Sequence, residues 1–257
     1  MCGISQLYLI ACSGKKVGPG QGPAWQEARN HDGWNKFQCL DEERNDLLNF
    51  YSRLTRGEAD SVYVAPRGLK TQSSRNIENA WVKNLTLKSC PTMRAVDRYD
   101  GTVYQILGKK LSEGLSSSSN SILLIISSLF GILHPNDMIP DYELMMKDRS
   151  PYNTAVYKWW SDIFERRRLS TILEERYSGL KNIYCFLSRT SGYIDAVRIL
   201  GEKFMTYIVS VENGSTGGST RAWGNSLKLC LEESPSNPDE IARIVEREGC
   251  KLIQLKG

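Results

Sequence analysis

An apolar run from Ile122 to Ile126 ends in two serines and leads directly into a turn and a polar loop. Such a run of isoleucine and leucine is typical of a strand that is buried on both faces of a sheet. Gly131 then permits a sharp turn of the backbone, and the loop after it holds His134 and Asp137. This order predicts that a central strand delivers hydroxyl, imidazole and carboxylate groups to one edge of an α/β sheet. The same residues also fit a strand that leaves the core through an ordinary turn.

Strand-like and helix-like segments alternate along the chain. Strands are predicted at Leu7 to Ala11, Val62 to Ala65, Met93 to Val96, Ile122 to Ile126, Ile183 to Leu187, Tyr207 to Val211 and Leu252 to Leu255. Helices are predicted at Asp41 to Arg56, Ile77 to Leu85, Val103 to Leu111, Thr154 to Arg167, Tyr193 to Leu200, Asn225 to Leu231 and Pro238 to Glu248. For the last of these, Asn237 provides a cap and Pro238 the first helical position. The alternation predicts one α/β domain over residues 1–257, with a mixed, mostly parallel sheet flanked by helices and a helical insertion at 147–180.

Composition excludes several classes of protein. The chain has 257 residues, of which 40% are hydrophobic and 24% charged, as in an ordinary globular protein. No apolar run approaches the roughly 18 residues of a membrane helix, and the N-terminal segment is typical of a first strand rather than a signal peptide. Seven cysteines without a CxxC pair and two histidines indicate free thiols in a reducing compartment. We therefore expect a cytoplasmic protein with no membrane partner, metal site or cofactor, whose oligomeric state the sequence does not define.

Three loops at predicted strand ends carry groups that suit phosphate. They are residues 12–16, 127–137 and 212–224, and each offers small residues or hydroxyls, two of them with a cation. Backbone amides, hydroxyls and cations in such loops form anion sites, and ligands of open α/β sheets collect at these ends. The expected phosphate or substrate contacts are Ser13, Lys15, Ser128, Gly217, Gly218 and Arg221, with Trp223 available for stacking on a base.

Four residues of these and neighbouring loops are candidates for catalysis. Cys12 could be a nucleophile activated by a neighbouring lysine, or a small residue at a strand end. His134 with Asp137 could act as a general base, or the pair could cap the next turn. Asp100 could present a carboxylate to the anomeric centre of a nucleoside, or cap the helix that begins near Thr102.

A basic segment that contains tryptophan suggests nucleic acid, most readily DNA, as a partner. Lys158 and Trp159 stand close to Arg166, Arg167 and Arg168. Cations next to an aromatic ring suit phosphate contact combined with base stacking. The alternative is a solvated helix face whose tryptophans are buried.

The motifs around these residues resemble those of the peroxide-stress protein YaaA family. The segment Ser128-Leu129-Phe130-Gly131-Ile132-Leu133-His134-Pro135-Asn136-Asp137, followed by Tyr142-Glu143-Leu144, is similar to the family's Ser-Gly-Leu-Tyr-Gly and Pro-Tyr-Arg-Leu motifs. The segment from Tyr99 to Tyr104 resembles its Phe-x-Gly-x-Val-Tyr motif, and Cys12 begins a Cys-x-x-Lys-Lys start found in small relatives. His134 stands where the family commonly has Arg.

The resemblance implies a YaaA-like fold and a protein that binds nucleic acid or a nucleotide in the response to oxidative stress. The alternative is an enzyme that acts on a nucleotide or nucleobase, by cleaving an N-glycosidic bond or transferring a base, in a pocket built from the three loops. The residues alone leave both functions open.

Overall fold

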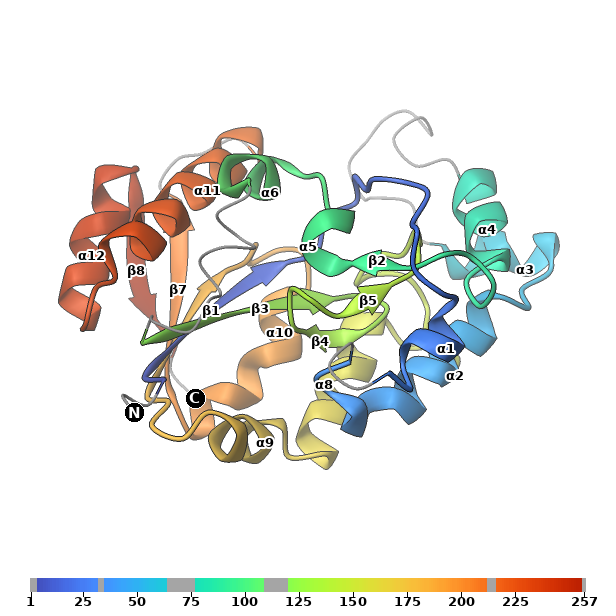
Figure 1. The fold of residues 1–257 in the computed structure, drawn as a ribbon, viewed down its shortest axis with the longest axis horizontal. Coiled ribbons are helices and arrows are strands. Elements are labelled where there is room, and N and C mark those ends of the chain that lie inside the picture. The colour runs from blue at the N-terminus through green and yellow to red at the C-terminus, as the bar shows by residue number, and fades with distance from the viewer. Residues whose placement is uncertain (1–3, 32–34, 64–76, 109–119, 212–215, 256–257) are drawn as a thin grey trace.

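A six-stranded sheet forms the centre of the molecule, which we describe from a computed structural model covering residues 4–31, 35–63, 77–108, 120–211 and 216–255 (Figure 1). Its strands lie in the order β4-β3-β1-β6-β7-β8. In chain order they are β1 Gln6–Ala11, β3 Ser121–Ser127, β4 Gly131–Leu133, β6 Asn182–Phe186, β7 Met205–Val211 and β8 Cys250–Gln254. A separate two-stranded sheet pairs β2 Met93–Arg94 with β5 Met138–Ile139.

The four inner strands run parallel. β1 pairs with β3 on one side and with β6 on the other, and β7 continues the sheet beyond β6, whereas β4 and β8 are antiparallel edge strands. After β1 the chain moves to β3, and it later returns to the opposite side of β1 to form β6. The loops that leave β1 and β6 therefore diverge, and the point between these strands is the topological switch point of the sheet.

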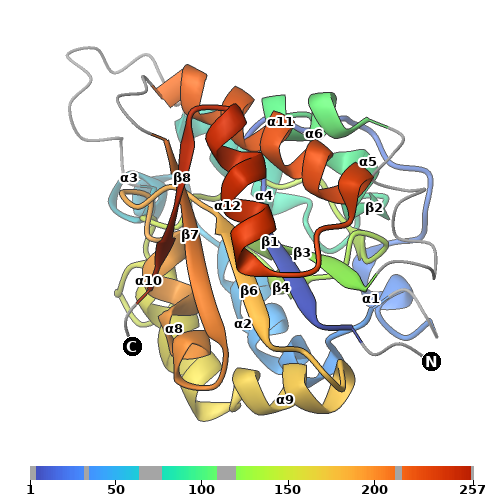
Figure 2. The ribbon, with the colours of Figure 1, turned by 90° about the vertical axis from the view of Figure 1, so that its left-hand side faces the viewer.

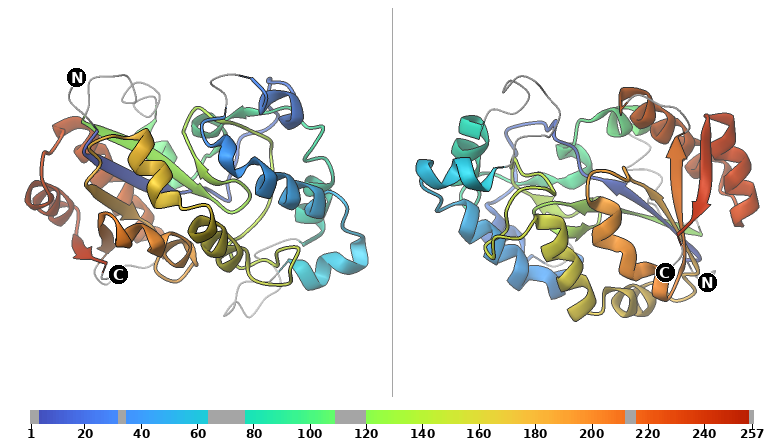
Figure 3. Two further views of the ribbon diagram at one scale, coloured as in Figure 1. Left: turned by 90° about the horizontal axis from the view of Figure 1, so that it is seen from below. Right: turned by 180° about the vertical axis from the view of Figure 1, so that it is seen from behind.

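Helices cover both faces of this sheet, as Figures 1 and 2 show. One face carries α6 Thr102–Leu107, α11 Thr216–Glu233 and α12 Pro238–Arg247. Views from below and behind show the other face covered by α8 Val156–Arg166, α9 Leu169–Arg176 and α10 Tyr193–Val197 with the 3-10 helix η2 Arg198–Glu202 (Figure 3). Beyond the β4 edge lie α1 Trp25–Ala28, the 3-10 helix η1 Gln38–Leu40, α2 Asp41–Tyr51, α3 Arg56–Val62, α4 Ile77–Leu85 and α5 Ala95–Arg98 (Figure 1).

The predicted fold class is confirmed, and so are β1, β3, β6, β7 and β8 of the sheet, whereas the edge strand β4 was expected as part of a loop. β1, β3 and β6 are almost wholly buried along their lengths, as expected for parallel strands covered on both faces. The helix at Ile77–Leu85 has the predicted bounds, and Asn237 caps α12 by accepting a hydrogen bond from the Glu240 amide at 3.0 Å.

Several element predictions were wrong, each for a local reason. The strand expected from Val62 is instead the end of α3, which starts at a capping box formed by Thr55 and Glu58; residues 64 and 65 lie outside the described part. The strand at Met93 stops after two residues because α5 begins at Ala95. The helix predicted from Asp41 to Arg56 ends at Tyr51.

The glycine-rich segment expected as a loop before a helix is largely helical. α11 begins at Thr216, so Gly217, Gly218 and Arg221 lie within the helix, while residues 212–215 are outside the described part. In the residues that the structure describes, no helix has both the length and the apolar character needed to cross a membrane.

Gly131 makes the tight return from β3 into β4 possible. Its φ is +66°, and a Cβ at this position would stand 2.7 Å from a ring carbon of Trp160. Trp160 is fully buried, and its indole N–H donates to the Ser128 carbonyl at 2.8 Å, so the ring cannot move aside easily. The turn thus requires both the left-handed backbone and the missing side chain.

Replacing Gly131 by Ala should lower the free energy of unfolding by about 3 kcal/mol, because positive-φ strain and overpacking against Trp160 add together. Urea denaturation followed by circular dichroism measures the loss. Gly57 is the matched control: it lies in α3 with nothing within 4 Å of its added Cβ. Gly57→Ala should stabilise the protein by up to about 1 kcal/mol. Equal effects of the two substitutions would contradict the role given to Gly131.

Candidate functional site

The loops that leave β1 and β6 meet at the carboxyl edge of the sheet. Cys12 follows β1, and its amide donates to the Ile126 carbonyl at 2.9 Å, which holds it in line with β3. Tyr193 begins α10 after Gly192, whose φ is +86°. The Cys12 Sγ lies 3.1 Å from the Tyr193 hydroxyl oxygen, and Cys12 remains half-buried. This contact joins the two loops across the topological switch point. We call the residues Cys12, Lys16, Tyr99, Tyr142 and Tyr193 the switch-point cluster.

Three hydroxyl groups in and beside the cluster form an ordered chain. The Ser127 hydroxyl oxygen accepts hydrogen bonds from the amides of Leu129 at 3.2 Å and Phe130 at 3.1 Å, so both of its lone pairs are used. Its proton must therefore go to the Tyr142 oxygen at 2.9 Å, and Tyr142 in turn donates to Tyr99 at 2.8 Å. Burial raises the pKa of Tyr142 and of Tyr99 well above the ordinary value, so both stay protonated. The chain leaves the Tyr99 proton for a further acceptor.

Lys16 lies against the aromatic rings of this chain. Its Nζ is 4.2 Å from the ring centroid of Tyr142 and 5.9 Å from that of Tyr99, within reach of cation–π attraction. Burial lowers the pKa of Lys16, although the charges of Cys12, Glu143 and Asp141 act in the opposite direction. A partly desolvated ammonium in this position favours a bound anion.

Lys15 points elsewhere, because the segment around it pairs with residues 98–100 in an extended conformation. Lys16 forms an isolated β-bridge with Tyr99, and the Asp100 amide donates to the Lys15 carbonyl at 2.9 Å. In extended backbone, neighbouring side chains alternate in direction. Lys15 thus reaches the surface, where its Nζ lies 2.6 Å from an Asp100 carboxylate oxygen.

Asp100 is committed to this ion pair and to Gln105. Lys15 and Gln105 both hydrogen-bond its carboxylate and lower its pKa. The N-cap of α6 is Gly101, with no side-chain hydrogen bond, so the expected capping role of Asp100 was wrong. Gly101 packs so closely on Ser13 that a Cβ there would stand 2.4 Å from the Ser13 Oγ.

The loop after β6 supplies polar groups that the sequence reasoning missed. Ser188 and Thr190 form a hydroxyl pair at 3.2 Å, Ser191 donates to the Ser188 carbonyl at 3.1 Å, and Arg189 is exposed. The signal was present in the sequence: a hydroxyl-rich segment with Arg and Gly between a predicted strand and a predicted helix. It is the same signal that identified the Cys12 loop.

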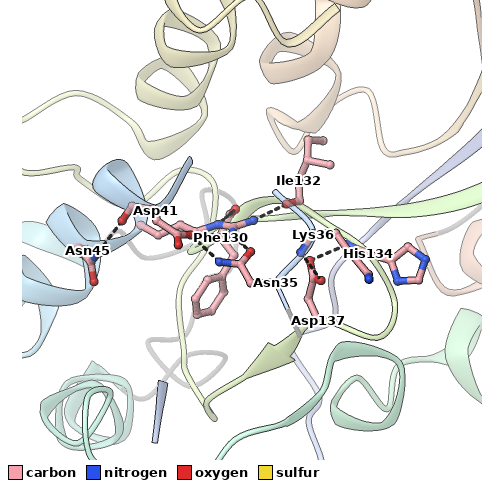
Figure 4. Close-up of polar contacts among 9 residues, drawn as sticks. Asn35, Lys36, Asp41, Asn45, Phe130, Ile132, His134 and Asp137 are labelled. Carbon is pink, nitrogen blue, oxygen red and sulfur yellow. Dashed lines mark hydrogen bonds and ion pairs between the residues drawn. The ribbon is translucent and has the colours of Figure 1, made fainter. Parts of the chain in front are cut away.

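His134 and Asp137 do not join the switch-point cluster; Figure 4 shows Asp137 bonded to the segments of Lys36 and His134. β4 runs back along β3 and pairs Leu133 with Ile125, so the next residues lie away from the carboxyl edge. The Asp137 carboxylate accepts from the amides of Lys36 and His134, each at 2.9 Å, and therefore staples two loops together. The His134 Nδ1 accepts from the Asn136 amide at 3.2 Å instead of contacting the carboxylate.

A buried arginine supports this loop from the side of α2. Arg44 is fully buried; its Nε donates to the Phe130 carbonyl at 3.0 Å and its Nη2 to the Ile132 carbonyl at 2.7 Å. It also bonds the side chains of Asn35 and Asp41 (Figure 4). One guanidinium thus fixes β4 and the segment that enters α2.

The pKa values of His134 and Asp137 stand in the reverse of their usual order, with the carboxyl group above the imidazole. Burial, with the charges of Lys36 and Arg176, lowers the pKa of His134 to about 4. Burial raises the pKa of Asp137 to about 6, against smaller opposing contributions from Arg44 and the two amides. At neutral pH the imidazole is neutral and the carboxylate charged.

The other residues expected at the site lie in separate places. Ser128 is buried and donates to the Leu144 carbonyl at 2.8 Å. Trp223 is half-buried and donates to the Val209 carbonyl at 2.8 Å, whereas Arg221 and Gly218 are exposed on α11. Gly217 lies in the first turns of α11. Of the expected phosphate contacts, Ser13 and Lys15 are the ones that flank the switch-point cluster.

The basic segment of α8 forms a surface of mixed charge. Trp159 is 6% exposed and packs edge-to-face on Trp160, so its ring is not free to stack on a base. Arg167 pairs with Glu42 and with Glu43, whose carboxylate lies 2.7 Å from its Nε. Lys158, Arg166 and Arg168 are exposed. A cavity of about 620 Å³ beside them is lined by Glu42, Glu43, Asp46 and Asp162 as well as by Arg166 and Arg167.

The described residues contain no group of three or more His, Cys, Asp or Glu side chains able to hold a metal ion. The cysteines of the described part, including Cys12, are free thiols. The switch-point cluster itself presents the Cys12 thiol, three tyrosine hydroxyls and the Lys16 ammonium.

Fold and site together define an open α/β protein with a polar cluster at the switch point of its sheet. A family model described as peroxide stress protein YaaA matches residues 7–249, and the chain belongs to this family.

Its relatives match over parts of their length. An uncharacterized protein of Campylobacter jejuni is 29% identical over 178 residues, which cover 66% of this chain and 67% of that protein. A UPF0246 protein of Corynebacterium efficiens is 41% identical over 108 residues, covering 42% and 40%, and one of Malacoplasma penetrans is 34% identical over 83 residues, covering 31% and 34%. The matched segments thus span from about a third to about two thirds of these relatives.

Replacing His134 by Gln should make the protein more acid-tolerant than the wild type. The folded pKa of His134, about 4, lies below the ordinary 6.5, so the unfolded chain takes up the proton first and acidification favours unfolding. Asp137 acts in the opposite direction, because its folded pKa, about 6, exceeds the ordinary 3.8. Without His134, the variant should gain about 2 kcal/mol relative to the wild type between neutral pH and about pH 5.

Urea unfolding at the two pH values measures this difference. His31→Gln is the control, since that residue is exposed. If His134→Gln and His31→Gln change the pH dependence of unfolding equally, His134 is not held in the neutral form by its surroundings.

Proposed function

We propose that this protein binds a nucleotide, free or at the end of a nucleic acid, at the switch-point cluster. The observation that carries the proposal is the 3.1 Å contact between Cys12 and Tyr193, which brings the loops after β1 and β6 together. Ligands of open α/β sheets bind outside the carboxyl ends of the strands at such a point.

The charges of the cluster support an anionic ligand. Lys16 is half-buried beside two tyrosine rings, and a bound phosphate would offset the cost of its partial desolvation. Ser13 on the loop after β1 and the exposed Arg189 on the loop after β6 are further candidate phosphate contacts. The exposed cations Lys158 and Arg166 of α8, and Arg168 at the start of α9, are available for phosphates of a longer nucleic acid, in contacts that do not involve base stacking by Trp159.

The surroundings of Cys12 favour a covalent step as a second candidate function. Burial raises the pKa of Tyr193 well above its ordinary value, so its hydroxyl stays protonated and is able to donate to the sulfur 3.1 Å away. The thiolate is the nucleophilic form of cysteine. Attack of a Cys12 thiolate on the anomeric carbon of a nucleoside would form a C–S bond as the C–N bond to the base breaks. The Tyr99 hydroxyl would donate a hydrogen bond to the departing base, which takes its proton from solvent.

Alkylation of Cys12 by iodoacetamide should slow in the presence of nucleotide, because the ligand covers the thiol. Mass spectrometry of the modified peptides reads Cys12 and the half-buried Cys90, which does not belong to the cluster, in the same sample, so Cys90 serves as the internal control. AMP, ATP and a single-stranded oligonucleotide are the probes. Lys16→Met, which keeps the aliphatic packing but removes the charge, should weaken the protection about tenfold. Equal labelling of Cys12 with and without all three probes would exclude the proposed binding.

Membership of the family suggests a role in peroxide stress, which is a prediction about the whole protein. A bacterial strain that lacks its own YaaA-family gene should survive hydrogen peroxide better when this chain is expressed. Cys12→Ala should lose this effect because the switch-point thiol is removed, whereas Cys90→Ala should keep it. Survival at equal protein levels is the measurement. Full protection by Cys12→Ala would separate the peroxide function from this site.

A further inference from the structure

A second cavity lies away from the switch-point cluster, between η1 and α9. Its volume is about 300 Å³, and its lining residues are Asn35, Lys36, Gln38, Cys39, Ile172 and Arg176. This lining contains two cations and no carboxylate. Burial raises the pKa of the Cys39 thiol, so Cys39 adds no negative charge to the cavity at neutral pH.

Neighbouring residues hold the backbone of Lys36 and the guanidinium of Arg176. The Lys36 amide is bound to the Asp137 carboxylate at 2.9 Å, which fixes the backbone of that residue beside the His134 loop (Figure 4). The Arg176 guanidinium lies 5.0 Å from the ring centroid of Phe37, the residue next to Lys36. The Asn35 side chain donates to Asp41 at 2.7 Å and accepts from the buried Arg44. The wall of the cavity is therefore rigid on the side of residues 35–37.

The charge of this cavity is not compensated inside the described part of the chain. Neither Lys36 nor Arg176 makes an ion pair with a described residue. Several other exposed cations of the described part, such as Arg56, Arg94 and Lys203, are paired with a carboxylate. Two carboxylates lie beside the cavity and both are already engaged. Asp137 accepts two backbone amides and is 1% exposed, and Asp41 pairs with the buried Arg44 and accepts from Asn35. Two cations facing one cavity attract a dianion.

We propose that this cavity binds a phosphate group, inorganic or carried by a small metabolite, between Lys36 and Arg176. The planar guanidinium of Arg176 suits two oxygens of the phosphate, and the Lys36 ammonium provides a point charge for a third. The amide of Gln38, exposed at the rim, is a further donor. Two positive charges match the charge of a phosphomonoester at neutral pH better than that of a single carboxylate.

The protein contains its own reporter for this site. Lys36 and Arg176 both lower the pKa of His134, so neutralising them with a bound anion should raise it. The groups that act on the imidazole are Lys36 and Arg176, with Asp137 stapled to its loop and Arg44 behind that carboxylate. The chain has one other histidine, His31, so the two imidazole signals can be assigned by one substitution.

The test is an NMR titration of both histidines in sodium phosphate and in sodium chloride of equal ionic strength. Phosphate should raise the pKa of His134 by about one unit and leave His31 unchanged. Arg176→Ala should abolish the phosphate effect, while Arg243→Ala, which removes one exposed positive charge from α12, should preserve it. Arg176→Lys keeps the charge and should retain part of the effect.

AMP replaces inorganic phosphate in a second arm. If AMP raises the pKa of His134 at a lower concentration than inorganic phosphate does, the cavity binds the phosphate of a nucleotide. If both act at the same concentration, the cavity recognises the phosphate group alone. Because Cys12 alkylation reads the switch-point cluster independently, binding at the two places can be told apart. No difference between phosphate and chloride, an equal shift at His31, or an undiminished shift in Arg176→Ala would overturn the proposal.

Discussion

The parallel pairing of β1 with two neighbours determines most of what this molecule can do. Every residue of β1 from Gln6 to Ile10 has a partner in both β3 and β6, and the strand is buried almost throughout. Parallel strands require crossover connections, so helices cover both faces of the sheet. Because β1 is followed by β3 on one side and later flanked by β6 on the other, two loops must diverge at its carboxyl end. The contact between Cys12 and Tyr193 is a consequence of this order of strands.

The sequence predicted this architecture but only part of the site. Apolar runs such as Ile122 to Ile126 identify buried strands, and strand ends identify candidate loops, so Cys12 and Ser13 were found. The direction of β4 could not be read from three residues, since a short apolar segment after a turn fits either a loop or an antiparallel return. That return carries His134 and Asp137 away from the edge. The buried Arg44, which fixes the return, has no sequence signature because a buried and an exposed arginine look alike.

The two proposed anion sites differ in how their charge is arranged. At the switch-point cluster, Lys16 lies on aromatic rings, while Lys15 is neutralised by Asp100. At the cavity between η1 and α9, Lys36 and Arg176 face one space, and the Asp137 carboxylate beside it serves as a backbone staple. In each place an aromatic ring lies against one cation, Tyr142 against Lys16 and Phe37 against Arg176.

The hydrogen bonds among the hydroxyl groups of Ser127, Tyr142 and Tyr99 all run in one direction. Two amides of the turn after β3 occupy the Ser127 oxygen, so every proton in the chain is directed from Ser127 through Tyr142 to Tyr99. In the motif that this segment resembles, the position of Tyr99 is occupied by Phe, which has no hydroxyl. The Tyr99 hydroxyl at the end of the chain of hydrogen bonds is thus a feature of this protein, whereas an aromatic ring at this position is common to both. Since burial keeps Tyr99 protonated, its hydroxyl can donate a hydrogen bond to a ligand oxygen or to a nitrogen of a base.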